Sequence, residues 1–422
     1  MIMKKHVTLL SLFVFSWVLS AQENPAKPDL KYRVEQVAGW VFYSPARPVV
    51  QVVVANQKEA MSAVLQLDVA TDTYCPIATF SQKIALQKGD STVVDFSFTL
   101  PNPGFYRCTL SEGDKLVRKF NIGYEPEAIV SLPDNQPDLK PFWEKAKAEL
   151  ASVAPEYHLT QIPDSSNKTR RLYQVTMKSL GGVEISGYYS VPVRKGSYPA
   201  VISYMGYGSK PWIPGGTPGF VEFVLSTRGQ GLQESSNSYG DWIAYRLDDK
   251  DNYYYRGAFM DVIRAIDFVS SRPEVNPAYI FAEGGSQGGA FSLSAAALDQ
   301  RLCAIAPAIP FLSDYPDFFK IVHWPADPVL MKQKELGMSD ADLYKVLSYF
   351  DIKNLAGWIK CPVIMAVGLQ DEVCPPHTNF SGYNRISANK EYYIYPLNGH
   401  NTPDNWWKTR MEFFEKQMKR KE

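Results

Sequence analysis

The feature that most constrains this chain is a serine set among glycines, Gly284-Gly285-Ser286-Gln287-Gly288-Gly289. A short apolar run, 279–282, precedes it and an alanine-rich run, 290–298, follows it. This order predicts a strand, a sharp turn that carries Ser286, and a helix. Glycines fit such a turn because larger side chains would collide with the adjacent strand and helix. The same five-residue pattern also occurs in ordinary Gly/Ser turns, but its flanks favour a nucleophile whose hydroxyl faces the free N–H groups of the helix.

Length and charge limit the classes of partner. The chain has 422 residues, of which 45% are apolar and 21% charged, so it is long enough for two domains with large cores. It carries 44 Lys plus Arg against 44 Asp plus Glu. With no net charge to attract polyanions, we expect neither nucleic acid nor a membrane surface as partner.

The first residues have the pattern of an export signal. Lys4 and Lys5 precede an apolar run, 7–19, and small Ser20 and Ala21 precede polar residues. The pattern predicts a signal peptide over residues 1–21 and a secreted or periplasmic protein. A membrane anchor is the alternative, but the run is too short to span a bilayer comfortably.

Residues 22–125 alternate apolar and polar side chains in short runs, as in 63–70, 94–99 and 106–110. Roughly seven such runs separated by Gly and Pro turns predict a small β-sandwich of the immunoglobulin-like class. No histidine occurs in it, and no catalytic constellation. We interpret it as a structural domain that packs on a second domain, with carbohydrate or partner contact as the alternative.

Five cysteines are too few and too scattered for a disulfide scaffold, and their spacing predicts no metal site. Cys75 and Cys108 are the only pair within one early segment. An exported protein could bridge them, but Cys108 falls on the apolar face of its run, so a buried free thiol is the equal alternative.

Residues 126–136 contain prolines and read as a linker, after which the pattern changes over 137–422. Asp138 is placed to cap a helix, and 172–179 with 183–191 predicts a hairpin. Buried strand patterns then alternate with helical ones, which indicates an α/β domain with a mostly parallel sheet. The strands are expected at 200–204, 221–225, 279–282, 302–306, 363–367 and 392–395, with helices at 259–271, after Ser286 and from residue 405. In such sheets the site lies beyond the carboxyl ends of the strands.

A serine nucleophile needs a base, and the base needs an orienting acid. His400 lies just beyond the strand at 392–395, so it is the predicted base. Asp371 lies where the strand at 363–367 runs into a loop, and it is the predicted acid, although Glu372 is adjacent. His323 and His377 are interpreted as packing or surface residues.

The oxyanion of an acyl-transfer intermediate needs two N–H donors. One is predicted to be the backbone N–H of Gln287, directly after the nucleophile. The other is predicted to be that of Tyr207, in the glycine-flanked turn that follows the strand at 200–204. An ordinary glycine-rich loop would be the simpler reading of that turn without Ser286.

Together these segments resemble the acetyl xylan esterase/cephalosporin C deacetylase family of α/β-hydrolases, carbohydrate esterase family 7. The resemblance runs from about Pro137 to the C-terminus and rests on Gly206-Tyr207-Gly208, Arg228-Gly229-Gln230-Gly231, Tyr253-Tyr254-Tyr255-Arg256-Gly257, Ser271-Arg272-Pro273-Glu274-Val275, the Ser286 stretch, Gly368-Leu369-Gln370-Asp371 with Cys374-Pro375-Pro376, and Gly399-His400. It implies removal of acetyl groups from sugars by a Ser286, Asp371 and His400 triad, with an oxyanion hole of Tyr207 and Gln287. It also implies a short acyl pocket, no metal, no cofactor and often a hexameric ring.

Three departures from the family pattern stand out. Met205 replaces a common histidine before the Gly-Tyr pair, and Asn401 replaces a common glutamate after His400. The β-sandwich is an addition, so substrate range and homo-oligomer assembly do not transfer directly. A peptidase or an acyltransferase/thioesterase of the same fold is the alternative enzyme, and a hydrolase-like binding protein is the non-enzymatic one.

Overall fold

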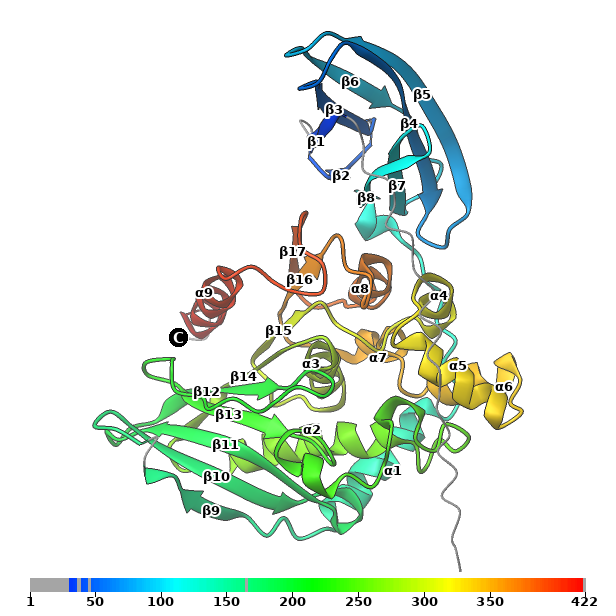
Figure 1. Cartoon of the computed structure of the whole chain (residues 1–422). Helices are drawn as coiled ribbons and strands as arrows, with labels where there is room; N and C mark the ends of the chain where they lie inside the picture. Colours follow the sequence, from blue (N-terminus) through cyan, green and yellow to red (C-terminus); the bar gives the residue numbers. More distant parts are fainter. Residues whose placement is uncertain (1–29, 36–38, 45–46, 164–165, 420–422) are drawn as a thin grey trace, which may run out of the picture.

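The computed structural model describes residues 30–35, 39–44, 47–163 and 166–419. Figure 1 shows two parts: a β-sandwich near the N-terminus, coloured blue to cyan, and a larger α/β region that holds the rest of the chain. The expected signal peptide, residues 1–21, lies outside the described residues. None of the helices in the described ranges is long and apolar enough to cross a membrane.

The sandwich consists of two sheets in the described residues, with strand orders β1-β3-β6 and β2-β8-β7-β4-β5. Alternate side chains point between the sheets, so the sequence pattern of period two becomes the core. The strands are β1 (Lys31–Glu35), β2 (Val41–Phe42), β3 (Val49–Ala55), β4 (Met61–Thr71), β5 (Pro76–Leu86), β6 (Ser91–Ser97), β7 (Gly104–Glu112) and β8 (Lys115–Tyr124).

The strand order is that of an immunoglobulin-like sandwich, as the sequence predicts. Tyr106, near the start of β7, donates its hydroxyl to the Asn102 carbonyl at 2.6 Å, which is the tyrosine corner of this fold. All five cysteines are free thiols: Cys75 is exposed and Cys108 is buried. The bridge alternative for this pair is therefore wrong, and burial raises the pKa of the Cys108 thiol.

The α/β region is built on a nine-stranded sheet with the order β17-β16-β15-β14-β12-β13-β11-β10-β9. The strands from β13 to β17 along this order are parallel, and β9 to β11 are antiparallel. The strands are β9 (His158–Gln161), β10 (Arg170–Lys178), β11 (Glu184–Pro192), β12 (Tyr198–Tyr204), β13 (Val221–Ser226), β14 (Val275–Gly285), β15 (Ala304–Ala308), β16 (Val363–Gly368) and β17 (Lys390–Tyr395).

Helices cover the sheet unevenly. The helices α2 and α3 pack on one face of β12 and β14, where the largest core of the molecule lies, while α9 packs on the other face, against β15 and β16. The helices are α1 (Leu139–Ala151), α2 (Tyr254–Ser270), α3 (Gln287–Leu298), α4 (Tyr315–Ile321), α5 (Ala326–Glu335), α6 (Asp340–Leu347), α7 (Ile352–Leu355), α8 (Pro376–Tyr383) and α9 (Trp406–Lys419).

Two local predictions need correction. The helix expected from residue 259 begins at Tyr254, because the tyrosines that open it are buried and extend its apolar surface. Asp138 stands at the N-cap position of α1, but its side chain makes no capping hydrogen bond. Its carboxylate instead accepts the Tyr349 hydroxyl and lies 3.5 Å from Lys250 Nζ, since stronger tertiary partners are within reach.

The sandwich packs on the part of the α/β region that carries β16, β17, α4 and α8 (Figure 1). The aromatic rings of Phe105 and Phe380 lie 5.7 Å apart between centroids. The backbone N–H of Asn121 donates to Gln370 Oε1 at 2.7 Å, and its side-chain amide donates to the Leu369 carbonyl at 3.0 Å. The sandwich therefore contacts the loop that directly precedes Asp371.

Candidate active site

Ser286 stands between β14 and α3 with φ 58° and ψ −121°, a strained backbone conformation for a residue with a side chain. The glycines two residues away on each side explain how the turn closes. A Cβ at Gly284 would lie 2.5 Å from the Tyr204 carbonyl oxygen, and one at Gly288 only 2.0 Å from it. Only glycine lets β14 and α3 approach β12 this closely, so the pattern is a structural requirement of the turn.

His400 and Asp371 lie together beyond the ends of β17 and β16. His400 Nδ1 is 2.9 Å from Asp371 Oδ2 and 3.1 Å from Oδ1. The Asp371 side chain is fully buried, and its Oδ1 also accepts the N–H groups of Val373 and Cys374 at 2.8 and 2.9 Å. These bonds fix the carboxylate, which in turn fixes the imidazole, while the histidine side chain remains 29% exposed.

Ser286 and His400 line one cavity of about 580 Å³, so the sequence-predicted nucleophile and base share a space that a ligand can enter. In the described part of the chain no hydrogen bond joins the two side chains. The contact of Ser286 Oγ is instead the Cys374 thiol, at 3.9 Å. Burial raises the pKa of that thiol, which keeps it neutral. Hydrogen bonds between catalytic groups are often long without substrate and tighten when it binds.

The loop after β12 lies beside the serine. A Cβ at Gly206 would lie 4.0 Å from the Ser286 Cβ, and Tyr207 is the next residue of this loop. Within the described residues nothing accepts a hydrogen bond from the Tyr207 N–H. Gln287 is the first residue of α3, so its N–H has no acceptor inside the helix. Both amides are thus available to an incoming oxygen.

The sequence analysis gave no role to Gln230, yet this side chain connects the two amide-bearing segments. Its Oε1 accepts the Gly208 N–H at 3.0 Å and the Gln287 side-chain amide at 3.2 Å. Its Nε2 donates to the Tyr254 hydroxyl at 2.7 Å. Gln230 therefore holds the loop of Tyr207 in position, and the only sequence signal for it was the Arg-Gly-Gln-Gly block.

The arginine of the same block is also structural. Arg228 pairs with buried Asp261, with Nη2 2.7 Å from Oδ1 and Nε 2.9 Å from Oδ2. A Cβ at Gly257 would lie 2.1 Å from this guanidinium, which explains the glycine after the tyrosines and Arg256. The ion pair anchors the loop after β13 to α2, behind the candidate site.

The other candidate acid and bases lie elsewhere. Glu372 and His323 are exposed. His377 has its Nδ1 2.8 Å from Asp72 of the sandwich and its Nε2 3.3 Å from Asp317. Ligand atoms of His377, Asp317 and Asp314 lie within 4.8 Å of one another, as a metal site requires.

That cluster already has cations of its own. Lys353 Nζ lies 3.0 Å from Asp314 Oδ1. Burial alone would lower the pKa of His377, but hydrogen bonds to Asp317 and Asp72 outweigh it and raise the pKa to about 10. The carboxylates are therefore neutralised by an imidazolium and an ammonium, and the cluster joins the sandwich to α4 and α8 as a salt-bridge network.

The two departures from the family pattern have different surroundings. Met205 is buried, and its sulfur accepts the Ser226 hydroxyl at 3.5 Å, so it fills space below the loop of Tyr207. Asn401 is exposed, and its N–H donates to the Gly399 carbonyl at 2.8 Å in the turn that carries His400. Neither Met205 nor Asn401 takes part in the hydrogen bonds between Asp371 and His400.

The sequence profile of the family described as acetyl xylan esterase (AXE1) matches residues 130–418, which is most of the chain. The chain belongs to this family. Membership makes it a carboxylic ester hydrolase, and the family's α/β-hydrolase fold is the fold of the α/β region described above.

Relatives of known structure support this membership. The acetyl xylan esterase 1 of Thermoanaerobacterium sp. JW/SL YS485 is 29% identical, with a TM-score of 0.64 and coverage of 69% of this chain and 98% of its own. The acetyl xylan esterase of Paenibacillus sp. R4 is 30% identical, with the same TM-score and coverage. The likeness to both therefore leaves about a third of this chain unmatched.

A curated relative extends further. Acetyl esterase Axe7A of Xylanibacter ruminicola is 26% identical over 442 residues, and the alignment covers 97% of each chain. An alignment of that extent includes the sandwich region. The two solved esterases thus match 69% of this acetyl xylan esterase family member, whereas Axe7A matches 97% of it.

Proposed function

We propose that the protein is an exported serine carboxylesterase that removes acetyl groups from acetylated xylo-oligosaccharides. One observation carries the mechanism: His400 is bonded to buried Asp371 and lines the same cavity as Ser286 on its strained turn. Family membership and the names of the relatives support the substrate class. The sequence pattern of residues 1–21 supports export to a secreted or periplasmic location.

In the proposed reaction His400 takes the proton of Ser286 as the hydroxyl attacks the acetyl carbonyl carbon. The carbonyl oxygen becomes an oxyanion that the Tyr207 and Gln287 N–H groups stabilise. Asp371 keeps His400 in the tautomer with Nδ1 protonated and stabilises the imidazolium that forms.

The tetrahedral intermediate collapses when the sugar oxygen leaves with the proton of His400, and Ser286 remains acetylated. Water then attacks the acetyl-enzyme, with His400 as base, and releases acetate and free serine. The proposed cycle consumes one water molecule for each acetyl ester, and it requires no metal, redox partner or cofactor. A short acyl pocket, which the family resemblance implies, is part of this proposal.

The test compares acetyl, butyryl and long-chain nitrophenyl esters beside acetylated xylan, with Ser286→Ala as control. We expect release of acetate from the xylan and rates that fall steeply as the acyl chain lengthens. Equal rates on long acyl chains would contradict the deacetylase assignment, and activity retained by Ser286→Ala would contradict the mechanism.

A further inference from the structure

The connection between the parallel strands β12 and β13 is unusual. Parallel neighbours need a crossover of a dozen residues or more, which is usually a helix. In this sheet β13 leads to β14 through α2, β14 to β15 through α3, and β16 to β17 through α8. The β12 to β13 connection is residues 205–220, all of them described, and it contains neither helix nor strand. The face of β12 beside α9 therefore lacks a covering helix, and the cavity of Ser286 extends across it.

Three strand side chains that line the cavity on that face are polar, namely Ser203, Glu222 and Glu283, although central strands of a parallel sheet are normally apolar on both faces. Ser203 of β12 donates its hydroxyl to Glu283 of β14, and Arg410 of α9 pairs with the same carboxylate. On β13, Glu222 Oε1 accepts the Thr217 hydroxyl at 2.8 Å. Strand positions that would pack under a helix thus supply hydrogen-bonding groups to an open groove.

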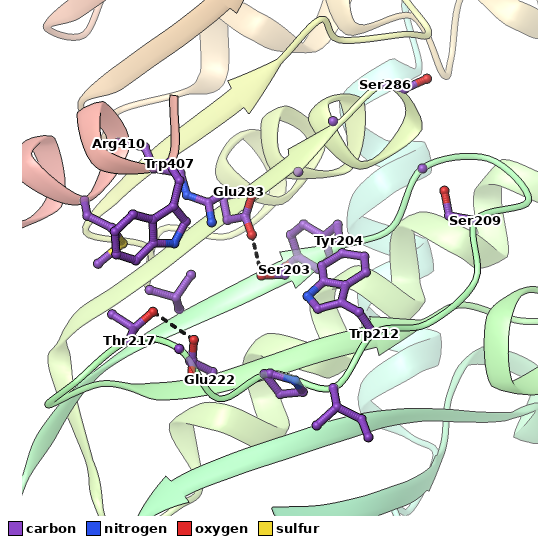
Figure 2. A pocket seen from close by; sticks show the side chains of 18 of the residues that line it. Ser203, Tyr204, Ser209, Trp212, Thr217, Glu222, Glu283, Ser286, Trp407 and Arg410 are labelled. Atoms are coloured by element: carbon purple, nitrogen blue, oxygen red, sulfur yellow. Dashed lines mark hydrogen bonds and ion pairs between the residues drawn. The ribbon is translucent and has the colours of Figure 1, made fainter. Parts of the chain in front are cut away.

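The walls of the groove are aromatic. Figure 2 shows Glu283 and Ser203 between Trp407 of α9 and Trp212 of the 205–220 connection. These two indoles are 48% and 43% exposed, which is unusual for the largest apolar side chain. An indole offers a flat face with partial negative charge, on which the C–H bonds of a sugar ring can pack.

The charges of the groove are balanced. Glu283 is matched by Arg410, and Glu222 Oε2 lies 2.9 Å from Arg170 Nη2. The groove thus presents donors and acceptors without a net charge, which favours a neutral polyol over an anion or a cation. Arg410 Nε is buried and has no hydrogen-bond partner among the described residues, while the side chain as a whole is 18% exposed at the groove.

We propose that this groove binds neutral sugar rings next to the acetylated ring of an oligosaccharide, with Trp212 and Trp407 as stacking surfaces and Arg410 and Glu283 bonding hydroxyls. The inference rests on the proposed function, because it places the acetyl ester at Ser286. Strand β14 runs from Glu283 to the serine, a distance of about 10 Å at ~3.3 Å per residue. A ligand of a few rings is long enough to span it, and Figure 2 shows Ser286 apart from Glu283 and the two tryptophans that line the same cavity.

The kinetic test uses Trp407→Ala and Trp212→Ala, with Trp324→Ala as matched control because that indole is 57% exposed and outside the cavity. The readout is kcat/KM on acetylated xylotetraose divided by kcat/KM on nitrophenyl acetate. We expect this ratio to fall about tenfold in each groove variant, mainly through KM on the oligosaccharide, and to stay unchanged in the control. An unchanged ratio in both groove variants, or an equal fall in Trp324→Ala, would overturn the proposal.

A binding measurement separates this proposal from the proposed reaction. Titration calorimetry of Ser286→Ala with unacetylated xylotetraose requires no catalysis. We expect binding that is lost in Ser286→Ala/Trp407→Ala, kept in Ser286→Ala/Trp324→Ala, and insensitive to salt because the ligand is neutral. Binding equal in the two double variants would overturn the groove, whereas a wild-type enzyme that releases no acetate would contradict the proposed function alone.

Discussion

The sandwich and the α/β region are both well packed, but they differ in what their polar side chains do. In the α/β region, polar groups at the carboxyl ends of β12, β14, β16 and β17 converge on the cavity of Ser286. In the sandwich, Asn121 and Asp72 have partners in the other region and lie at the contact with it. Within the described residues the sandwich contributes nothing to the cavity lining.

The α/β region thus supplies the cavity and its polar groups, and the sandwich contacts the loops behind them. Gln370 precedes Asp371, and its Nε2 donates to Asn121 of the sandwich at 3.2 Å and to Pro396, in the segment before His400, at 2.8 Å. The sandwich therefore holds the two loops that carry the predicted acid and base. Substitutions on either side of this comparison separate the two roles.

The largest effect is expected in the α/β region. Replacing Ser286 or His400 by Ala should lower kcat by about 10⁴-fold or more, because each removes a reacting group. The double variant should be no slower than the slower single one, since the two groups act as a unit. Steady-state acetate release measures this, and His323→Ala, an exposed histidine away from the site, should match the wild type.

Asp371→Asn should lower kcat by about 10⁴-fold, because an amide neither fixes the imidazole tautomer nor stabilises its cation. The matched control is Glu372→Gln, which changes the exposed neighbouring carboxylate in the same way. If the glutamate variant were the slower one, the acid would be misassigned.

The contact between the two regions should weaken at alkaline pH. The pKa of His377 is raised to about 10 by its aspartate partners despite burial, while an unfolded histidine titrates near 6.5. Its stabilising effect is complete below about pH 6.5 and is lost as the pH rises through 10, with a slope of at most ~1.4 kcal/mol per pH unit.

Denaturant unfolding of the wild type and His377→Gln between pH 6 and 10 measures this effect. The difference in unfolding free energy should shrink steadily as the pH rises. A constant difference would show that His377 is neutral in the folded protein.

The smallest effect is expected at the contact itself. Gln370→Ala removes the hydrogen bonds that join Asn121 to the segment of Pro396, so unfolding should cost about 1–2 kcal/mol less. Slight displacement of both loops should lower kcat about two- to tenfold, as ~1 kcal/mol in the barrier would. The comparison is Gln51→Ala, whose side-chain amide donates to Asp95 within the sandwich. A Gln370 variant with full kcat would leave the sandwich a purely structural role.

Sequence reasoning selected Ser286, Asp371 and His400 as candidates because each follows a predicted strand, and strand ends meet at one edge of a parallel sheet. The fold class was predictable for the same reason. The contacts of Gln230, Gln370 and Arg410 were not predictable from the sequence. Each residue acts through partners distant in the chain, and no local periodicity indicates such partners. The absence of a helix from the 205–220 connection was not predictable either, because a glycine- and proline-rich segment has the pattern of an ordinary loop.

The most direct test of the central claim is covalent labelling of the nucleophile. Treatment of the wild type with a fluorophosphonate should add one adduct per chain, abolish esterase activity in proportion, and map to the peptide that contains Ser286. Ser286→Ala should remain unlabelled. An adduct elsewhere, including on the adjacent Cys374, or full esterase activity after complete labelling of Ser286, would contradict the account.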